Sequence, residues 1–301
     1  MQIDLGAEGK LLAEVSWQPA GKQDHPALIL FHGLEGSARS HYLIGISKKA
    51  FARGFHTVRV NMRNCGGTEH LSPTLYCAAL SQDVLSVVRH LRDHHGIRDI
   101  YGMGVSLGAN ILLKFLGEQQ NDGDRYLKAA AVISPPLDLA LGARLLMEPS
   151  NWMYQRHFVK SLIQRLRRKS SFFPGIADIK RVEKIRTIWE FDDVVTAPHF
   201  GFASAEDYYR KASCGPLLRE IRVPTLLIHS EDDPLIPLDP FLTSGIEKNP
   251  HLLPLLTRHG GHAGFMGSKP ATDSDLDEYW AECRAVDFFV AHRRSAAAKV
   301  L

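Results

Sequence analysis

Short runs of mostly apolar residues, repeated along the chain, constrain its fold more than any other feature of the sequence. The clearest are ALILF (27–31), DIYGMGVS (99–106), LKAAAVIS (127–134) and PTLLIHS (224–230). A strand with one face in water alternates apolar and polar residues, so these runs indicate strands that are buried on both faces. Such strands form a mostly parallel sheet that is covered by helices on both sides.

Segments with the apolar spacing of helices alternate with these strands. We predict helices over residues 42–53, 78–95, 107–118 and 276–290, and further strands over 10–17, 56–62 and 251–259. The segment 10–17 alternates only weakly and is predicted to be an edge strand. The alternation of strands and helices places the chain in the α/β class.

The connection between the strands at 127–134 and 224–230 is roughly 90 residues long, which is far more than a normal loop and requires structure of its own. We therefore predict a helical cap at 136–220. It is inserted between a first part of the core at 1–135 and a second part at 221–301.

The predicted cap contains one amphipathic helix, at 156–169, with its apolar residues on one stripe. The opposite face carries the basic residues Arg165, Arg167, Arg168 and Lys169. We expect these side chains to be solvated, and contact with anionic lipid is the alternative. Three aromatic residues are expected to pack within the cap or to line an acyl pocket: Phe172, Phe173 and Trp189.

The segment GVSLG (104–108) has the pattern G-x-S-x-G and carries the strongest local signal for chemistry. A predicted strand precedes it and a predicted helix follows it, as a nucleophile elbow requires. The serine of such a turn has a strained backbone, and only small neighbours fit around it. We predict that Ser106 is a catalytic nucleophile; a tight turn with a helix-capping serine is the alternative.

A serine nucleophile needs a base and an acid that orients the base, and in this arrangement they follow in the order acid, then histidine. The strand at 224–230 ends at Glu231-Asp232-Asp233-Pro234. We favour Asp233 as the acid, because the proline after it forces an extended backbone. Asp232 suits a turn-forming role, and Asp138, after the strand at 127–134, is the rival acid.

The predicted base is His262, which lies in the glycine-rich segment GGHAG (260–264) after the last strand. His259 still belongs to the end of that strand, and an exposed loop histidine is the alternative reading of His262. His32 precedes the serine and is predicted to be structural, bonded to its own loop. The oxyanion donors are predicted to be the backbone N–H groups of Leu107 and Leu34.

Composition excludes several other classes. A formal net charge of +3 is too small to indicate nucleic-acid binding. The four cysteines are far apart and have no zinc-like spacing with histidines, so we expect no metal site, no disulfide framework and a reduced, cytoplasmic setting. No signal-peptide pattern or long apolar segment is present, so we expect a soluble protein without a transmembrane segment, with peripheral membrane contact as an option.

Six stretches together resemble the YheT-like branch of the α/β-hydrolase superfamily, which includes acyl ester synthases and lipid hydrolases. They are FHGLEGS (31–37), GVSLGANILLKFLGE (104–118), SPPLDL (134–139), FDDVVTAPHFGFASAEDYYRKAS (191–213), EDDPLIP (231–237) and GGHAGF (260–265). The resemblance implies carboxylester chemistry, with Ser106, Asp233 and His262 at the triad positions. One departure is NMRNCGG (61–67), where relatives usually carry a glycine near Asn64.

Together these features predict a serine carboxylesterase that cleaves esters of short- to medium-chain acyl groups through an acyl-enzyme. The partner is a small-molecule acyl ester, and no metal or organic cofactor is needed. Acyl transfer to an alcohol on the same triad is one alternative. A non-catalytic module that binds an apolar ligand is another.

Overall fold

A computed structural model of the chain describes residues 1–19, 21, 23–267 and 277–298. Within these residues, eight strands form one sheet in the order β1-β2-β4-β3-β5-β6-β7-β8. The strands are β1 (Gln2–Asp4), β2 (Lys10–Ser16), β3 (Ala27–Phe31), β4 (His56–Asn61), β5 (Ile100–Val105), β6 (Ala130–Ile133), β7 (Thr225–Ser230) and β8 (Leu252–Thr257). All neighbouring pairs from β4 to β8 are parallel, while β1 and β2 join antiparallel. The predicted mostly parallel sheet is confirmed.

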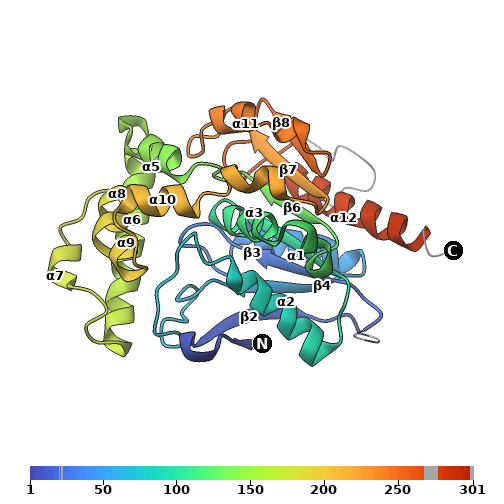
Figure 1. The fold of residues 1–301 in the computed structure, drawn as a ribbon, viewed down its shortest axis with the longest axis horizontal. Coiled ribbons are helices and arrows are strands. Elements are labelled where there is room, and N and C mark those ends of the chain that lie inside the picture. Colours follow the sequence, from blue (N-terminus) through green and yellow to red (C-terminus); the bar gives the residue numbers. More distant parts are fainter. Residues whose placement is uncertain (20, 22, 268–276, 299–301) are drawn as a thin grey trace.

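Helices cover both faces of the sheet (Figure 1). The helices outside the long insertion are α1 (His41–Ala52), α2 (Gln82–His95), α3 (Leu107–Gln119), α4 (Gly123–Tyr126), α11 (Asp239–Thr243) and α12 (Trp280–Ala298), with short turns η1 (Gly6–Glu8), η2 (Gln120–Asp122) and η6 (Ile246–Lys248). None of the helices in the described ranges is both long and apolar enough to cross a membrane.

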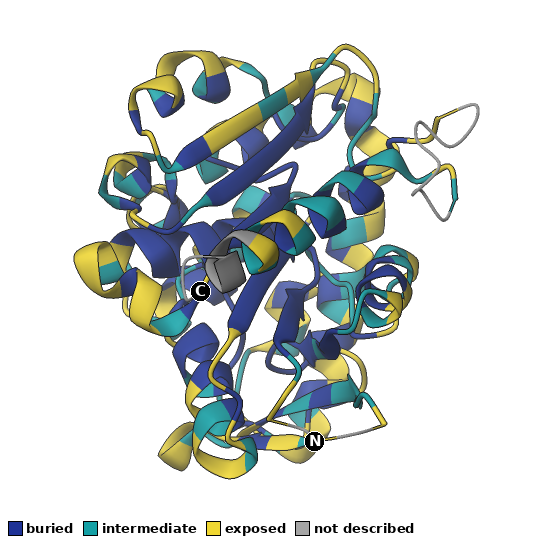
Figure 2. Cartoon of the chain, turned by 90° about the vertical axis from the view of Figure 1, so that its right-hand side faces the viewer, coloured by how far each residue is buried: buried dark blue, intermediate teal, exposed yellow. Residues whose placement is uncertain are grey.

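The central strands are buried on both faces because their side chains alternate between two apolar cores. In β3, Ile29 and Phe31 join the core that packs against α2 and α3. Leu28 and Leu30, between them, join the core that packs against α1 and α12. Figure 2 shows these strands as buried ribbons inside a shell of helices whose outer faces are exposed.

The position of one predicted strand and the starts of two predicted helices differ from the structure. The strand at 10–17 is not at the edge, because the three-residue strand β1 pairs with it. The second helix begins at Gln82 rather than at 78, because the backbone of Ala78 is bonded elsewhere: its N–H donates to the Tyr208 hydroxyl (2.8 Å) and its carbonyl accepts from Asn110 (3.2 Å).

The last helix also begins later than predicted. Leu276, its predicted first residue, lies outside the described residues. The helix α12 begins at Trp280 and runs to Ala298. Just before it, the Asp277 carboxylate accepts from the N–H of Tyr279 at 3.0 Å, a local turn that competes with helical bonding.

Between β6 and β7, a stretch described without gaps, all regular structure is helical, and most of these helices gather on one side of the sheet (Figure 1), while the last, η5, packs on α3. They are α5 (Leu139–Met147), η3 (Pro149–Asn151), α6 (Trp152–Phe172), α7 (Ile179–Val182), α8 (Ile188–Phe191), η4 (Asp192–Thr196), α9 (Ala197–His199), α10 (Ala205–Ala212) and η5 (Gly215–Glu220). The predicted helix at 156–169 is the central part of α6.

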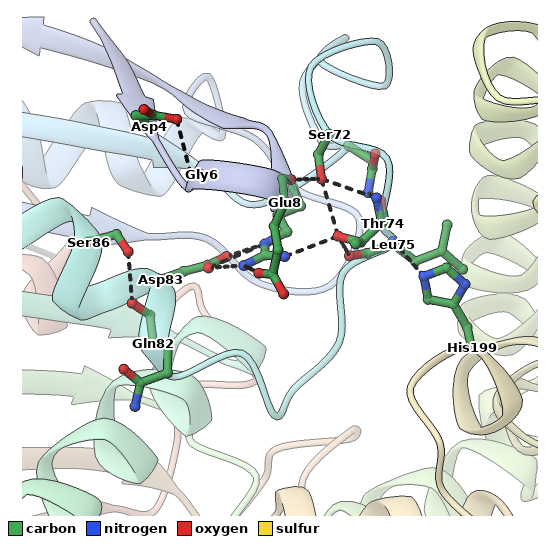
Figure 3. Close-up of polar contacts among 12 residues, drawn as sticks. Asp4, Gly6, Glu8, Ser72, Thr74, Leu75, Gln82, Asp83, Ser86 and His199 are labelled. Atoms are coloured by element: carbon green, nitrogen blue, oxygen red, sulfur yellow. Dashed lines mark hydrogen bonds and ion pairs between the residues drawn. The ribbon is translucent and has the colours of Figure 1, made fainter.

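The loop that follows β4, residues 62–77, joins the sheet domain to these inserted helices (Figure 3). The buried guanidinium of Arg63 anchors it, with ion pairs to Asp83 (2.5 Å) and Glu8 (2.6 Å). Further along the loop, the N–H of Leu75 donates to Nε2 of His199, from α9, at 3.1 Å.

The same loop changes the environment of the basic face of α6. Asn64 has a φ of 63°, a left-handed conformation that explains why a glycine suits this position. Its side-chain oxygen accepts from Nζ of Lys169 (2.7 Å), which also donates to the carbonyls of Glu69 and Ser72. Burial lowers the pKa of Lys169 to about 8.

The prediction that the basic residues of α6 are solvated therefore holds for only half of them. Arg167 and Arg168 have side chains that are 52% and 58% exposed. Arg165 and Lys169 are buried, and for them the prediction is wrong. Helical periodicity could not reveal this, because the acceptors come from distant loops: Glu69 lies 100 residues before Lys169, and Glu35 lies 130 residues before Arg165.

A second buried ion pair joins α1 and α12 on the other face of the sheet. Lys49 Nζ lies 2.7 Å from the Glu282 carboxylate and 2.6 Å from that of Asp277. Burial raises the pKa of Glu282 to about 7, against the opposing effect of Lys49.

We predict that Lys49→Met lowers the free energy of unfolding by roughly 3–5 kcal/mol, because it leaves a buried carboxylate unpaired. Urea unfolding measures this; a loss below 1 kcal/mol would contradict it.

Candidate active site

Ser106 lies at a sharp turn between β5 and α3. Its backbone has φ 54° and ψ −120°, a conformation that is strained for a residue with a side chain. A Cβ atom on Gly104 would lie 2.5 Å from the carbonyl oxygen of Gly108, and one on Gly108 would lie 2.5 Å from that of His32. Only glycine fits at either position, so the two glycines of the pattern have a steric cause.

The acid and the base predicted from sequence are in direct contact. Nδ1 of His262 lies 2.9 Å and 3.1 Å from the two carboxylate oxygens of Asp233. The Asp233 side chain is fully buried, and its Oδ1 also accepts from the N–H groups of Leu235 (2.9 Å) and Ile236 (3.1 Å). These bonds fix the carboxylate, which in turn orients the imidazole.

Ser106 and His262 line the same cavity, together with Leu34 and Leu107. Among the described residues, the Ser106 hydroxyl has no hydrogen-bond partner, so it is available to the cavity. The loop that carries His262 is tied to strand ends: Ser134 Oγ donates to the His262 carbonyl at 2.5 Å, and Ser230 Oγ to that of Gly261 at 2.6 Å.

The rival residues have other partners. Asp232 accepts from the N–H groups of Gly260 (2.9 Å) and Gly261 (2.8 Å) and lies 3.2 Å from His259, a histidine whose side chain is 88% exposed. The bond from Gly261, above all, lowers the pKa of Asp232. Asp138 is the N-cap of α5 and accepts from the N–H of Leu141 (3.0 Å). Asp232 thus holds the histidine loop, and Asp138 a helix end.

The loop after β3 lies against the serine. A Cβ on Gly33 would be 3.1 Å from the Ser106 Cβ. The N–H groups of Leu34 and Leu107 have no acceptor within the described part of the chain, and both residues line the cavity.

His32 is structural, as expected. Its Nε2 accepts from the N–H of Met62 (3.1 Å), so its Nδ1 carries the proton and donates to the Gly33 carbonyl (2.7 Å). Burial lowers the pKa of His32 to about 4.

The inserted helices supply a mostly apolar part of the cavity wall. It includes Leu139, Leu146, Phe158, Leu162, Leu166, Ile188 and Phe191. The aromatic residues singled out in the sequence, Phe172, Phe173 and Trp189, are not among the residues that line it. The apolar stripe of the helix at 156–169 marked Leu162 and Leu166 in the sequence, whereas no sequence pattern marked the wall residues of α5 and α8.

Two charged residues of the cavity wall were missed by sequence reasoning. Asp192 is half-buried and accepts from the hydroxyls of Thr196 and Tyr209, each at 2.6 Å, and partial removal from water raises its pKa to about 6. Arg165 is paired with Glu35 at 2.8 Å. Tyr209 lies 17 residues after Asp192, and Glu35 lies 130 residues before Arg165, so no local spacing pattern marks these contacts.

Comparisons with known proteins agree with this fold. The profile of a family described as alpha/beta hydrolase fold matches residues 26–268. The YheT protein of Escherichia coli K12 is 33% identical over 93% of this chain and 81% of its own length. The chain therefore belongs to the α/β-hydrolase family, in the branch that contains YheT.

Other relatives are longer than this chain. Two from Saccharomyces cerevisiae are a monoacylglycerol lipase (32% identical) and medium-chain fatty acid ethyl ester synthase/esterase 2 (30%); the match covers 88% of this chain in both cases, but only 59% and 62% of theirs. Among solved structures, an esterase of Pyrococcus furiosus superposes with a TM-score of 0.60 at 15% identity, covering 96% of this chain and 90% of that one.

The three candidate acids make different contacts, so their substitutions should lower kcat to different extents. Asp233→Asn should lower kcat for ester hydrolysis by roughly 10³–10⁴-fold, because an amide cannot stabilise the cationic imidazole. Asp232→Asn should cost less than about tenfold, since its amide oxygen can still accept from the loop. Asp138→Asn should leave kcat nearly unchanged. Steady-state kinetics on a p-nitrophenyl ester measures all three, and a crippled Asp138→Asn enzyme would identify Asp138 as the acid.

Proposed function

We propose that this protein is a serine esterase that cleaves carboxylic esters of short- to medium-chain acyl groups. The single observation that supports this most is the buried Asp233–His262 pair beside a serine on a strained strand–helix turn. The two yeast relatives, a lipase and an ester synthase/esterase, point to the same chemistry.

In the proposed mechanism, Ser106 Oγ attacks the ester carbonyl while Nε2 of His262 takes its proton. The negative charge on the carbonyl oxygen is held by the N–H groups of Leu34 and Leu107. Collapse of this intermediate breaks the ester C–O bond, and His262 returns the proton to the leaving alcohol. Water, deprotonated by His262, then cleaves the acyl-enzyme and regenerates the serine. Asp233 stabilises the imidazolium throughout.

We further propose that residues 136–220 act as a cap that measures the acyl chain. Apolar residues of α5, α6 and α8 line the same cavity as Ser106 and His262. An acyl chain placed there leaves water and contributes roughly 0.8 kcal/mol for each buried methylene. Residues 1–135 and 221–301 then form the two parts of the core that carries the triad.

Alcoholysis is the second candidate, because the acyl-enzyme can react with an alcohol in place of water. The observation that favours it is the similarity to the yeast ester synthase/esterase. Product analysis with added ethanol separates the two outcomes.

The role of Ser106 is tested by substitution. Ser106→Ala should lower kcat by about 10⁴-fold or more with the fold intact, because the covalent path is lost. The same variant should no longer be labelled by a fluorophosphonate probe that labels the unaltered protein. Near-normal turnover, or labelling that persists, would remove Ser106 from the mechanism. An unaltered protein that neither turns over esters nor takes the probe would instead favour a ligand-binding module.

A series of p-nitrophenyl esters tests the cap. We expect kcat/KM to rise roughly three- to fourfold per methylene from acetyl to butyryl or hexanoyl esters, and to fall for very long chains. Leu162→Asp or Leu166→Asp should weaken this preference more than it weakens acetyl-ester hydrolysis. A flat profile from acetyl to octanoyl would show that recognition lies on the alcohol side.

A further inference from the structure

Glu35 is an unusual residue for the loop beside a nucleophile, because its carboxylate is buried and fully bonded. Its side chain is 5% exposed and that of Arg165 is 7% exposed. Oε1 accepts from Nε and Nη2 of Arg165, both at 2.8 Å, and from the Tyr76 hydroxyl at 2.8 Å. Oε2 accepts from Ser161 Oγ at 2.8 Å. Arg165 and Ser161 both belong to α6.

This arrangement holds the backbone as well as the side chain. Glu35 has a φ of 57°, which a residue with a side chain rarely adopts unless its surroundings impose it. The Glu35 N–H donates to the Tyr76 hydroxyl at 3.2 Å, and the Arg165 guanidinium stacks on the Tyr76 ring at 4.3 Å. The Glu35 backbone is thus fixed by the same ring that supports Arg165.

Glu35 follows Leu34 directly, and the peptide before Leu34 packs against Ser106. The N–H of Leu34 is one of the two oxyanion donors in the proposed mechanism. A shift of Glu35 would therefore move this donor, and an oxyanion donor acts only when it lies within hydrogen-bond distance of the developing charge.

We propose that Arg165 is a positioning residue: through Glu35, it holds the Leu34 N–H in the oxyanion hole, so that docking of the inserted helix α6 completes the catalytic site. This inference rests on the proposed esterase function. A positioning role would explain why Arg165 and Glu35 are buried as a pair, because such pairs contribute little net stability compared with apolar residues of the same volume.

The test compares kcat with KM in Arg165→Met and Glu35→Gln, using the p-nitrophenyl butyrate assay. We expect kcat to fall by about 10- to 100-fold in Arg165→Met, somewhat less than for outright loss of an oxyanion donor, with KM within about threefold of the unaltered value. Labelling by the fluorophosphonate probe should slow by a similar factor, because its phosphoryl oxygen occupies the same hole. The double variant should be no slower than the worse single variant.

Three variants serve as controls. Arg165→Lys keeps the charge and should recover part of the lost kcat. Lys49→Met removes a buried ion pair on the other face of the sheet, so it matches the loss of stability but should leave kcat unchanged. Arg167→Met removes an exposed arginine from the same helix, and its kcat should also stay unchanged.

A folded Arg165→Met enzyme with unaltered kcat would overturn the inference. So would a rise in KM alone, which would mean that Arg165 contacts substrate. Where Arg165→Met does not fold, Ser161→Ala removes one hydrogen-bond donor to Glu35 with a smaller loss of stability. This variant should reduce kcat by about two- to fivefold. A folded Ser161→Ala enzyme with full kcat would also refute the inference. Failure of the esterase function itself would appear separately, as an unaltered protein that neither hydrolyses esters nor takes the probe.

Discussion

The contact between two backbones at Gly108 is the constraint on which the candidate site depends. The first turn of α3 passes so close to the end of β3 that any side chain at this position would meet the carbonyl oxygens of Phe31 and His32. This approach places the serine turn beside the loop after β3, and so brings the Leu34 and Leu107 N–H groups to one cavity. A strained serine backbone is tolerated because packing on both sides leaves it no alternative.

Two adjacent carboxylates after β7, Asp232 and Asp233, hold different parts of the His262 loop. Asp232 bonds backbone N–H groups of the loop, and Asp233 bonds the ring. The difference arises from burial: the Asp233 side chain is inaccessible to solvent, whereas that of Asp232 is 43% exposed. A buried carboxylate with fixed N–H donors can hold an imidazole in one orientation, while an exposed one only steadies the loop.

The inserted helices do more than cover the cavity. They bury cations against the loops of the sheet domain: Lys169 on the 62–77 loop and Arg165 on Glu35. A buried charge is costly without partners, so these contacts fix where α6 can dock. Specific docking of α6 then defines both the apolar wall and, in our proposal, the oxyanion loop.

Local patterns were enough to predict the parallel α/β sheet, the Ser106 turn and the roles of Asp233 and His262. These patterns are the apolar runs, the glycines on either side of Ser106, and the proline that keeps the backbone of Asp233 extended. Long-range contacts determine which cations of α6 are buried, that β1 pairs with the strand at 10–17, and that Arg165 holds Glu35. These features join residues as far as 130 positions apart, and the free energy of burying a charge depends on partners that the local sequence does not contain.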